Sequence, residues 1–315
     1  MRTLAKFMTL AALAVAPLAA PVALAADYPS RPVKFVVPWP AGDLEDILTR
    51  IIAEEMASTT GKPATVVNKP GGGGVVGAAE VARTRPDGLT IGSFVADLMT
   101  TQLLGGNAPY QKNTFEPVGI FLDYPFVLAT KADAPYNNVA ELAKYSQSHK
   151  ISLGHFGYQA LPTAITYKTA DQAGIRFSSD AAFDSNDCST LANGDASVIN
   201  TTTQLILSCL KSGEVKILAA MTRERLSIAP DVKTLAEQTG ITQTTWNGLF
   251  VKQGTPQKIK DKIAAIASKA LKSKPVTGLS QSTGAVVYWV DGEAANQVIS
   301  KDYDNAQSLM KYINR

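Results

Sequence analysis

The chain has 315 residues, of which 45% are hydrophobic and 18% are charged, and its formal net charge at neutral pH is +3. This balance, without a cluster of Lys and Arg among aromatic residues, argues against a nucleic-acid-binding protein. The two histidines, His149 and His155, lie far from the two cysteines, Cys188 and Cys209, and no Cys-x-x-Cys spacing occurs, so we expect no metal site.

The first residues have the pattern of an export signal. Arg2 and Lys6 precede an uncharged run rich in Ala and Leu, which ends in the small-x-small sequence Ala23-Leu24-Ala25. A membrane anchor is the weaker alternative, because prolines interrupt the run and its apolar core is short for a bilayer span. We therefore predict a signal peptide over residues 1–25, whose removal lowers the net charge from +3 to +1.

Strand and helix patterns alternate after this segment. A buried strand at 33–37 ends in a Pro- and Gly-containing turn at 38–42, and apolar residues at three- and four-residue steps from Leu44 to Met56 predict an amphipathic helix. Asp43 stands at the N-cap position of that helix, and Asp46 follows three residues later as in an approximate capping box.

The same unit then repeats. A strand at 64–67, a glycine turn at 71–74, a helix at 75–84 and a strand at 89–93 are typical of a parallel sheet with right-handed crossovers. The sequence therefore predicts an α/β fold. Further strands are predicted at 126–130, 151–154, 196–200, 216–221, 248–252 and 286–290, and further helices at 139–146, 162–173, 256–272 and 293–312.

Gly72, Gly74 and Gly77 spell the G-x-G-x-x-G of dinucleotide-binding folds, and Asp97 follows where a ribose-binding acid would lie. We reject this interpretation, because residues 68–70 separate the strand from the first glycine and an exported protein has little access to nicotinamide cofactors. We expect no cofactor. The turn is either a flexible loop or a place where backbone N–H groups approach a ligand closely.

Cys188 and Cys209 are the only cysteines of the chain. In an oxidising compartment such a pair predicts a disulfide, which would close a loop of about twenty residues and stabilise the fold by about 3 kcal/mol.

Five groups of residues, in order along the chain, resemble one transport family. They are Tyr28–Val33, Val37–Gly42 with Asp46 and Arg50, Asn68–Gly74 with Gly77, Pro86–Thr90, and the stretches Arg223–Arg225, Pro230–Glu237 and Trp246 with Gly248. Together they resemble the substrate-binding subunits of tripartite tricarboxylate transporters, also called Bug proteins, over essentially the whole mature chain.

The resemblance implies a two-lobed periplasmic-binding-protein fold of type II, in which each lobe is a mostly parallel sheet flanked by helices and the ligand lies between the lobes. The chain crossings are expected near Asp123 and Thr245. One lobe would combine residues 27–124 with 246–315, and the other would span 125–245. We expect a periplasmic protein that is a monomer.

The function implied is capture of a small organic acid, or a related small molecule, and its delivery to the membrane components of a tripartite transporter. A ligand sensor for a signalling system would share this sequence and remains open. An exported enzyme has less support, because the chain contains no G-x-S-x-G, H-E-x-x-H or Walker A motif. We expect no catalytic residues and no nucleic-acid partner.

The resemblance places ligand contacts in loops at the ends of strands in both lobes. Trp39 is as consistent with a core or rim position as with ligand contact, and His155 is expected to be structural. The expected contact residues are Trp39, Pro40, Ala41, Gly42, Asp43, Leu44, Gly74, Val75, Val76, Gly77, Ser93, Phe94 and Ala96 in the first lobe, and Phe156, Gly157, Tyr158, Gln159, Ala160, Asn200 and Thr201 in the second.

Two loops depart from the family pattern. After Gly42 the family continues with glycine and a hydroxyl residue, whereas this chain has Asp43-Leu44-Glu45, and the loop at 156–163 is bulkier and lacks the family's histidine. Two like charges about 4 Å apart repel by roughly 1 kcal/mol in water and more in a dry cleft. We hypothesise a ligand with at most one carboxylate, or with a polar or cationic group toward Asp43, and an apolar body near Trp39 and Tyr158. Alternatively, Asp43 is only a helix cap turned away from the cleft.

Overall fold

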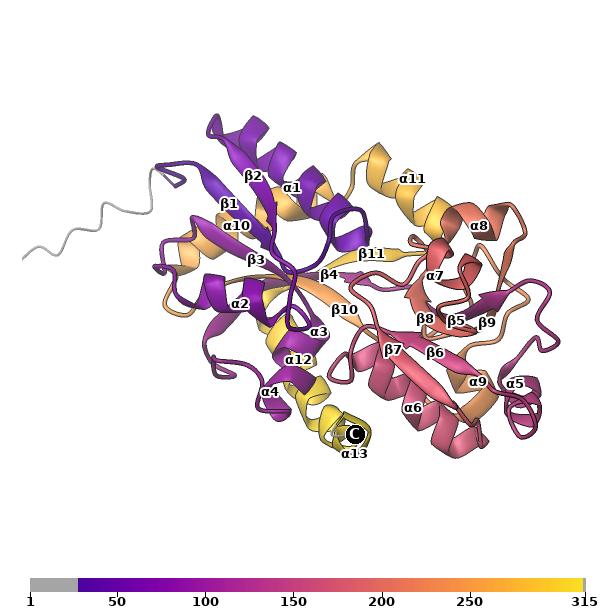
Figure 1. The fold of residues 1–315 in the computed structure, drawn as a ribbon. Helices are drawn as coiled ribbons and strands as arrows, with labels where there is room; N and C mark the ends of the chain where they lie inside the picture. Colours follow the sequence, from indigo (N-terminus) through magenta and orange to yellow (C-terminus); the bar gives the residue numbers. More distant parts are fainter. Residues whose placement is uncertain (1–27, 314–315) are drawn as a thin grey trace, which may run out of the picture.

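The computed structural model of the protein describes residues 28–313 and shows two sheets, each flanked by helices (Figure 1). The predicted signal peptide lies outside the described residues. Among the helices of residues 28–313, none has the length and the apolar character that crossing a membrane requires.

The first sheet has six strands in the order β11-β4-β10-β3-β1-β2. In Figure 1 it occupies the left half of the molecule, with its helices on both faces. Its strands are β1 (Val33–Val37), β2 (Ala64–Asn68), β3 (Thr90–Val95), β4 (Phe115–Asp123), β10 (Trp246–Lys252) and β11 (Val286–Asp291), and its helices are α1 (Leu44–Thr60), α2 (Val75–Ala82), α3 (Ala96–Met99), α4 (Thr101–Leu104), α10 (Gln257–Ala270) and α12 (Gly292–Gln307).

The second sheet has five strands in the order β7-β6-β8-β5-β9. Two C-terminal helices contact segments around this sheet. Thr203, directly after β8, donates to Thr283 of α11 (Lys274–Thr283), and Tyr312 of α13 (Met310–Ile313) donates to Asp171 of α6. Its strands are β5 (Phe126–Lys131), β6 (Ser152–His155), β7 (Ser179–Ala182), β8 (Val198–Thr202) and β9 (Val215–Ala220), and its helices are α5 (Val139–Tyr145), α6 (Leu161–Ala173), α7 (Cys188–Ala192), α8 (Leu207–Lys211) and α9 (Leu235–Thr239).

The α/β class is confirmed, but both sheets are mixed where we expected mostly parallel ones. β1 pairs in parallel with β2 and β3, whereas β10 runs antiparallel to both β3 and β4, and β5 runs antiparallel to β8 and β9. The reason lies in the chain path. β4 carries the chain toward the second sheet and β10 brings it back, and these two neighbouring strands must run in opposite directions.

The two chain crossings lie side by side. Asp123 is the register partner of Trp246, and the backbone N–H of Tyr124 donates to the carbonyl oxygen of Thr245 at 2.9 Å. The proposed lobe limits, 27–124 plus 246–315 and 125–245, stay a prediction. The helices α11 and α13 follow residue 246, yet they bond to Thr203 and to Asp171, which lie within 125–245.

The first helix begins as predicted. The Asp43 carboxylate accepts from the backbone N–H of Leu44 at 2.8 Å, and the Asp46 carboxylate accepts from the backbone N–H of Gly42 at 3.1 Å. Asp46 also holds Arg50 at 2.9 Å, so the charge of this nearby arginine is already paired. The apolar side of α1 is fully buried against the first sheet through Leu44, Leu48, Ile52 and Met56.

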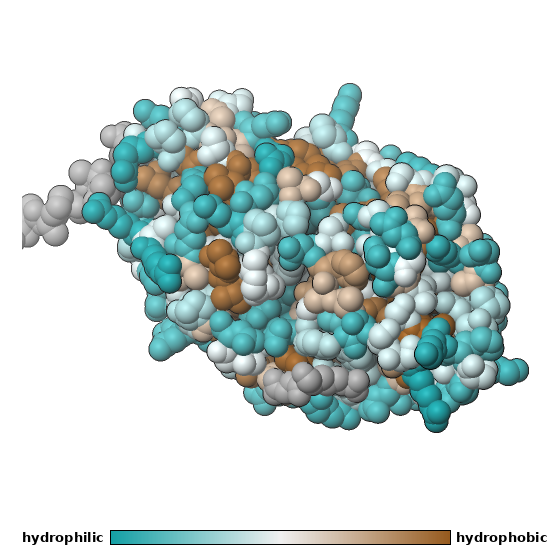
Figure 2. Space-filling view, in the orientation of Figure 1, coloured by the Kyte–Doolittle hydropathy of each residue, from teal (hydrophilic) through white to brown (hydrophobic). Residues whose placement is uncertain are grey.

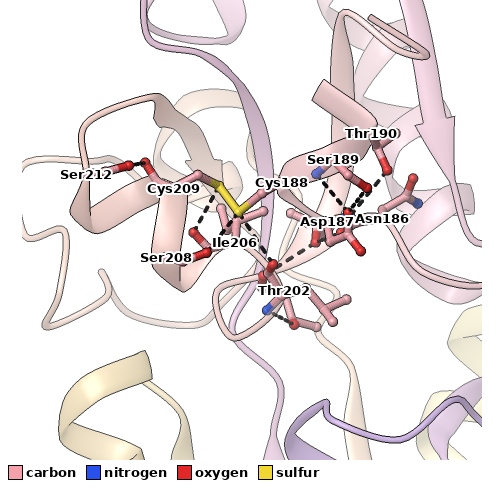
Figure 3. Close-up of a disulfide and its surroundings, with 12 residues drawn as sticks. Asn186, Asp187, Cys188, Ser189, Thr190, Thr202, Ile206, Ser208, Cys209 and Ser212 are labelled. Carbon is pink, nitrogen blue, oxygen red and sulfur yellow. Dashed lines mark hydrogen bonds between the residues drawn. A yellow bond between two sulfur atoms is a disulfide. The ribbon is translucent and has the colours of Figure 1, made fainter. Parts of the chain in front are cut away.

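A disulfide joins Cys188 at the start of α7 to Cys209 of α8 (Figure 3). It braces two loops of the second lobe. The loop before α7 is held because Asn186 accepts from Thr201, and the loop before α8 is held because the backbone N–H of Leu205 donates to Thr202. The face of the molecule seen in Figure 2 is mostly hydrophilic, with its apolar patches separated by polar residues.

We predict that the disulfide stabilises the fold by about 3 kcal/mol, because it closes a loop with a sequence separation of 21. Urea unfolding of a Cys188→Ala/Cys209→Ala variant measures this loss. Reducing agent should lower the stability of the wild type by a similar amount and leave the variant unchanged. Two alkylatable thiols in protein taken from the periplasm, found by mass spectrometry without reduction, would contradict the bridge.

Candidate ligand-binding site

A cavity of about 60 Å³ lies where the two lobes meet. Residues of α1, α3, the chain crossings and the loops of the second lobe surround it. Its lining consists of Trp39, Pro40, Ala41, Asp43, Glu45, Val95, Asp97, Tyr124, Phe126, Phe156, Ala160, Pro162, Asp184, Ser185, Leu205 and Thr245.

Asp43 faces this cavity and caps α1 at the same time. One carboxylate oxygen accepts from the Leu44 N–H and, at 2.8 Å, from the hydroxyl of Thr202 in the second lobe. Burial raises the pKa of Asp43 from 3.8 to about 6, and these two hydrogen bonds oppose the rise. The two interpretations of Asp43 that the sequence left open are therefore compatible.

Glu45 lies two residues further along α1, and its side chain is 2% exposed. It accepts a hydrogen bond from the hydroxyl of Tyr124 at 2.7 Å. Burial and then the neighbouring charge of Asp43 raise the pKa of Glu45 well above its usual range, while the bond from Tyr124 opposes this. A buried carboxyl group in these surroundings holds its proton more firmly than one in water.

Asp97, a further acidic group of the cavity, belongs to α3, and Asp184 also lines it. Burial raises its pKa from 3.8 to about 7, although backbone N–H groups of Asp97, Leu98 and Leu161 favour the ionised form. Its Oδ1 atom is buried and has no hydrogen-bond partner among residues 28–313. The residue as a whole is 2% exposed.

No basic side chain compensates these acids, since the described residues that line the cavity include no Lys, Arg or His. Much of the remaining wall is aromatic. The ring of Phe156 lies 6.3 Å from that of Trp39 and 5.9 Å from that of Phe126, which in turn lies 5.3 Å from the ring of Tyr124. The cavity thus combines acidic groups with an apolar wall that both lobes build.

Three contacts hold the lobes together around the cavity. Thr202 donates to Asp43, Thr101 donates to the backbone carbonyl oxygen of Gln159, and the backbone N–H of Leu161 interacts with Asp97. The structure therefore shows the arrangement in which the lobes are closed on each other.

The structure places only some of the predicted contact residues at this cavity. Six of the twenty residues line it, namely Trp39, Pro40, Ala41, Asp43, Phe156 and Ala160. The others do not line it; they are Gly42, Leu44, Gly74, Val75, Val76, Gly77, Ser93, Phe94, Ala96, Gly157, Tyr158, Gln159, Asn200 and Thr201.

Two strands end about two residues later than predicted, which accounts for four of these differences. Ser93 bonds to Asn247 within the first sheet, and Phe94 packs against Phe250 in the core. In the second lobe, Asn200 bonds to Thr163, and Thr201 bonds to Asn186. The groups that reach the cavity region come later, at Val95 and Asp97 after β3 and at Thr202 and Leu205 after β8.

The glycine loop leads elsewhere. Gly74 precedes α2 with a positive φ of 87°, and together with Gly71–Gly73 it lets the chain turn sharply. Val75 and Val76 line a separate groove with Gln102 and Gln159, so the loop supplies no wall of the cavity. Leu44 is a core residue of α1, fully buried.

Both ring nitrogens of His155 have partners within the second lobe. Its Nδ1 atom accepts from the backbone N–H of Gly157 at 2.9 Å, and its Nε2 atom lies 3.1 Å from Asp180. Tyr158 donates to the same carboxylate of Asp180, which turns its hydroxyl away from the cavity. Burial lowers the pKa of His155, although Asp180 opposes this.

Ten lining residues were not among the twenty predicted contacts. Asp97 drew attention only through the rejected dinucleotide motif. Thr245, at the predicted crossing, could have been found from the rule that ligands bind where the lobes join. The ten are Glu45, Val95, Asp97, Tyr124, Phe126, Pro162, Asp184, Ser185, Leu205 and Thr245; of these, Glu45 belongs to the departure from the family pattern after Gly42, and Val95 falls within the predicted loop at 93–96.

The family model of the tripartite tricarboxylate transporter family receptor, TctC, matches residues 48–315. The chain belongs to this family. It is therefore a solute-binding receptor, not an enzyme. The family recognised from the sequence motifs is confirmed.

Relatives of this TctC receptor agree along nearly its whole length. Protein BugT of Bordetella pertussis is 28% identical over 287 residues, which cover 87% of this chain and 86% of BugT. The structure of the periplasmic binding protein BugD superposes with a TM-score of 0.82 at 29% identity and covers 91% of this chain and 99% of BugD. MatC from Rhodopseudomonas palustris with bound malate gives a TM-score of 0.80 at 26% identity and covers 90% and 100% of the two chains. These neighbours confirm the two-lobed fold.

The buried acid at Asp97 should make the closed receptor less stable at neutral pH. Because the folded-state pKa is about 7 and the ordinary value is 3.8, stability is present below about pH 4 and is lost as the pH rises to about 7. We predict that Asp97→Asn is more stable than the wild type by an amount that grows by roughly 2 to 3 kcal/mol between pH 5 and pH 8. Denaturant unfolding of both proteins at the two pH values measures this, and a constant difference would contradict it.

Proposed function

We propose that this receptor captures one small organic molecule from the periplasm in the cavity between its lobes and delivers it to the membrane components of a tripartite transporter. The observation that carries the proposal is the cavity itself, which both lobes line and which hydrogen bonds such as Thr202 to Asp43 close. Binding between lobes couples ligand capture to a change of shape, and a membrane partner can recognise that change.

The relatives support the same role. BugD is described as a periplasmic binding protein, and MatC holds malate. A small carboxylate is therefore the ligand class that the family suggests, and the export pattern of residues 1–25 supports a periplasmic location. A sensor that reports the same solute to a signalling protein would use the same cavity and the same closure.

Capture between lobes predicts that the bound receptor is more compact than the free one. Small-angle scattering with and without a bound solute measures the radius of gyration. Binding without any change in the radius of gyration would speak against closure.

The contact between Thr202 and Asp43 should contribute to this affinity. The Thr202→Val variant keeps the shape of the side chain but removes its donor to Asp43. It should bind the solute about tenfold more weakly, because a hydrogen bond to a charged group is lost.

Trp39 should report on the cavity. The chain has three tryptophans, and a Trp246→Phe/Trp289→Phe variant leaves Trp39 as the remaining one. Because its ring lines the cavity and packs edge-on against Phe156 of the other lobe, a bound solute should change its fluorescence. If a saturating solute leaves the emission of the variant unchanged, the solute binds away from Trp39.

A further inference from the structure

We propose that the captured solute carries a protonated nitrogen, as a small amine with at most one carboxylate, and that Asp43, Glu45 and Asp97 recognise this nitrogen. The inference rests on the proposed function, because it takes the cavity between the lobes as the solute site. It adds the chemical class that this chain selects.

The helix N-termini at the cavity already carry carboxylates of the chain itself. Free N–H groups at helix N-termini attract anions. At α1 the Leu44 N–H is bound by Asp43, and at the start of α6 the backbone N–H of Leu161 favours the ionised form of Asp97. A carboxylate of the ligand would therefore meet a negative charge of the chain at each of these N-termini.

An unused acceptor shows what the cavity lacks. Asp97 Oδ1 is buried, lines the cavity and has no hydrogen-bond partner among residues 28–313. The hydroxyl of Thr245 and the indole N–H of Trp39 also line the cavity without a partner in this part of the chain, but only the Asp97 oxygen is purely an acceptor. Leaving a buried carboxylate oxygen without a donor is costly. An N–H group of the solute would supply that donor, and the Trp39 N–H would take one acceptor of the solute, such as a single carboxylate.

The charge balance points the same way. Four carboxyl groups, those of Asp43, Glu45, Asp97 and Asp184, line a cavity whose described lining has no basic side chain. Arg50, close to Asp43 in sequence, is bound by Asp46. An added anion would be repelled in this poorly solvated space, and an added cation would be attracted. The aromatic wall of Trp39 and Phe156 also favours a cation with an apolar body.

The titratable groups around Asp97 are acids and phenols. Asp43 and Glu45 of α1, Tyr124 of the crossing and Asp184 of the second lobe share its cavity, and the pKa of Tyr110 is raised in part by the charge of Asp97. None of them can offset the negative charge of the site.

Two matched series test the inference, each with an amine, an alcohol and a carboxylate of nearly equal size: butylamine, butanol and butyrate, and benzylamine, benzyl alcohol and benzoate. Malate, adipate and 4-aminobutyrate complete the panel. Isothermal titration calorimetry on the mature receptor at pH 7.5 gives the affinities. We expect the amine of at least one series to bind at least tenfold more tightly than its carboxylate, and 4-aminobutyrate to bind more tightly than malate or adipate.

The results that would contradict the preference for a cation differ from those that would contradict the receptor role. If no amine of the panel binds, or if benzoate, malate or adipate binds as tightly as the amines, the inference is overturned. The proposed function is judged separately, because a carboxylate that binds and compacts the receptor in small-angle scattering would retain the receptor role and remove only the preference for a cation.

Two variants assign the recognition to the acids. Asp97→Asn should weaken amine binding at least tenfold, and Asp43→Asn, which retains the ability to cap α1, should act in the same direction. Asp302→Asn is the matched control, because Asp302 is another acid whose pKa burial raises but it bonds to Trp246 away from the cavity. Its amine affinity should change less than twofold. Equal losses in all three variants, or none in Asp97→Asn and Asp43→Asn, would overturn the assignment.

Discussion

The carboxylate of Asp43 accepts one hydrogen bond from the backbone of its own helix and one from Thr202 in the other lobe. A single side chain therefore begins α1 and ties the lobes together, and its position fixes what else the cavity can contain. Glu45 follows on the same helix, and the closed lobes cover both groups so that water cannot solvate their charges. The site is built around burial of negative charge, and the cost of that burial is the basis of its selectivity.

That cost explains why the acids are concentrated where the lobes meet. Burial raises the pKa of a carboxyl group unless hydrogen bonds or an opposite charge compensate for the lost water. For Asp97 this compensation is incomplete, because its Oδ1 atom has no hydrogen-bond partner among residues 28–313. In the open receptor, water can reach such a group, whereas closure without a suitable solute removes that water. A solute that brings a donor and a positive charge would favour the closed form over the open one, so selection and closure would depend on the same groups.

The sequence predicted most of the fold but only part of the site. The helix that begins at Leu44 was recognised because its apolar spacing and its cap agree, while β4 was missed because Pro117 and Gly119 weaken its strand pattern, and β7 because it is a short exposed edge. An error of two residues at the ends of β3 and β8 shifted the predicted contacts to core residues such as Phe94. The role of Asp97 depends on the approach of the second lobe, which local sequence patterns do not describe.

The central claim is that buried carboxyl groups receive a positively charged group, and the protons exchanged on binding test it most directly. When the lobes are closed, burial raises the pKa of Asp43 to about 6 and that of Asp97 to about 7, so near pH 6.5 both hold part of a proton. In the open receptor, water reaches both groups and favours their ionised forms. A bound cation favours their ionised forms, whereas a bound anion favours their protonated forms. Titration calorimetry in buffers of different ionisation enthalpy counts these protons. The account predicts that the receptor takes up no protons when it binds its natural solute at this pH, and proton uptake would contradict it.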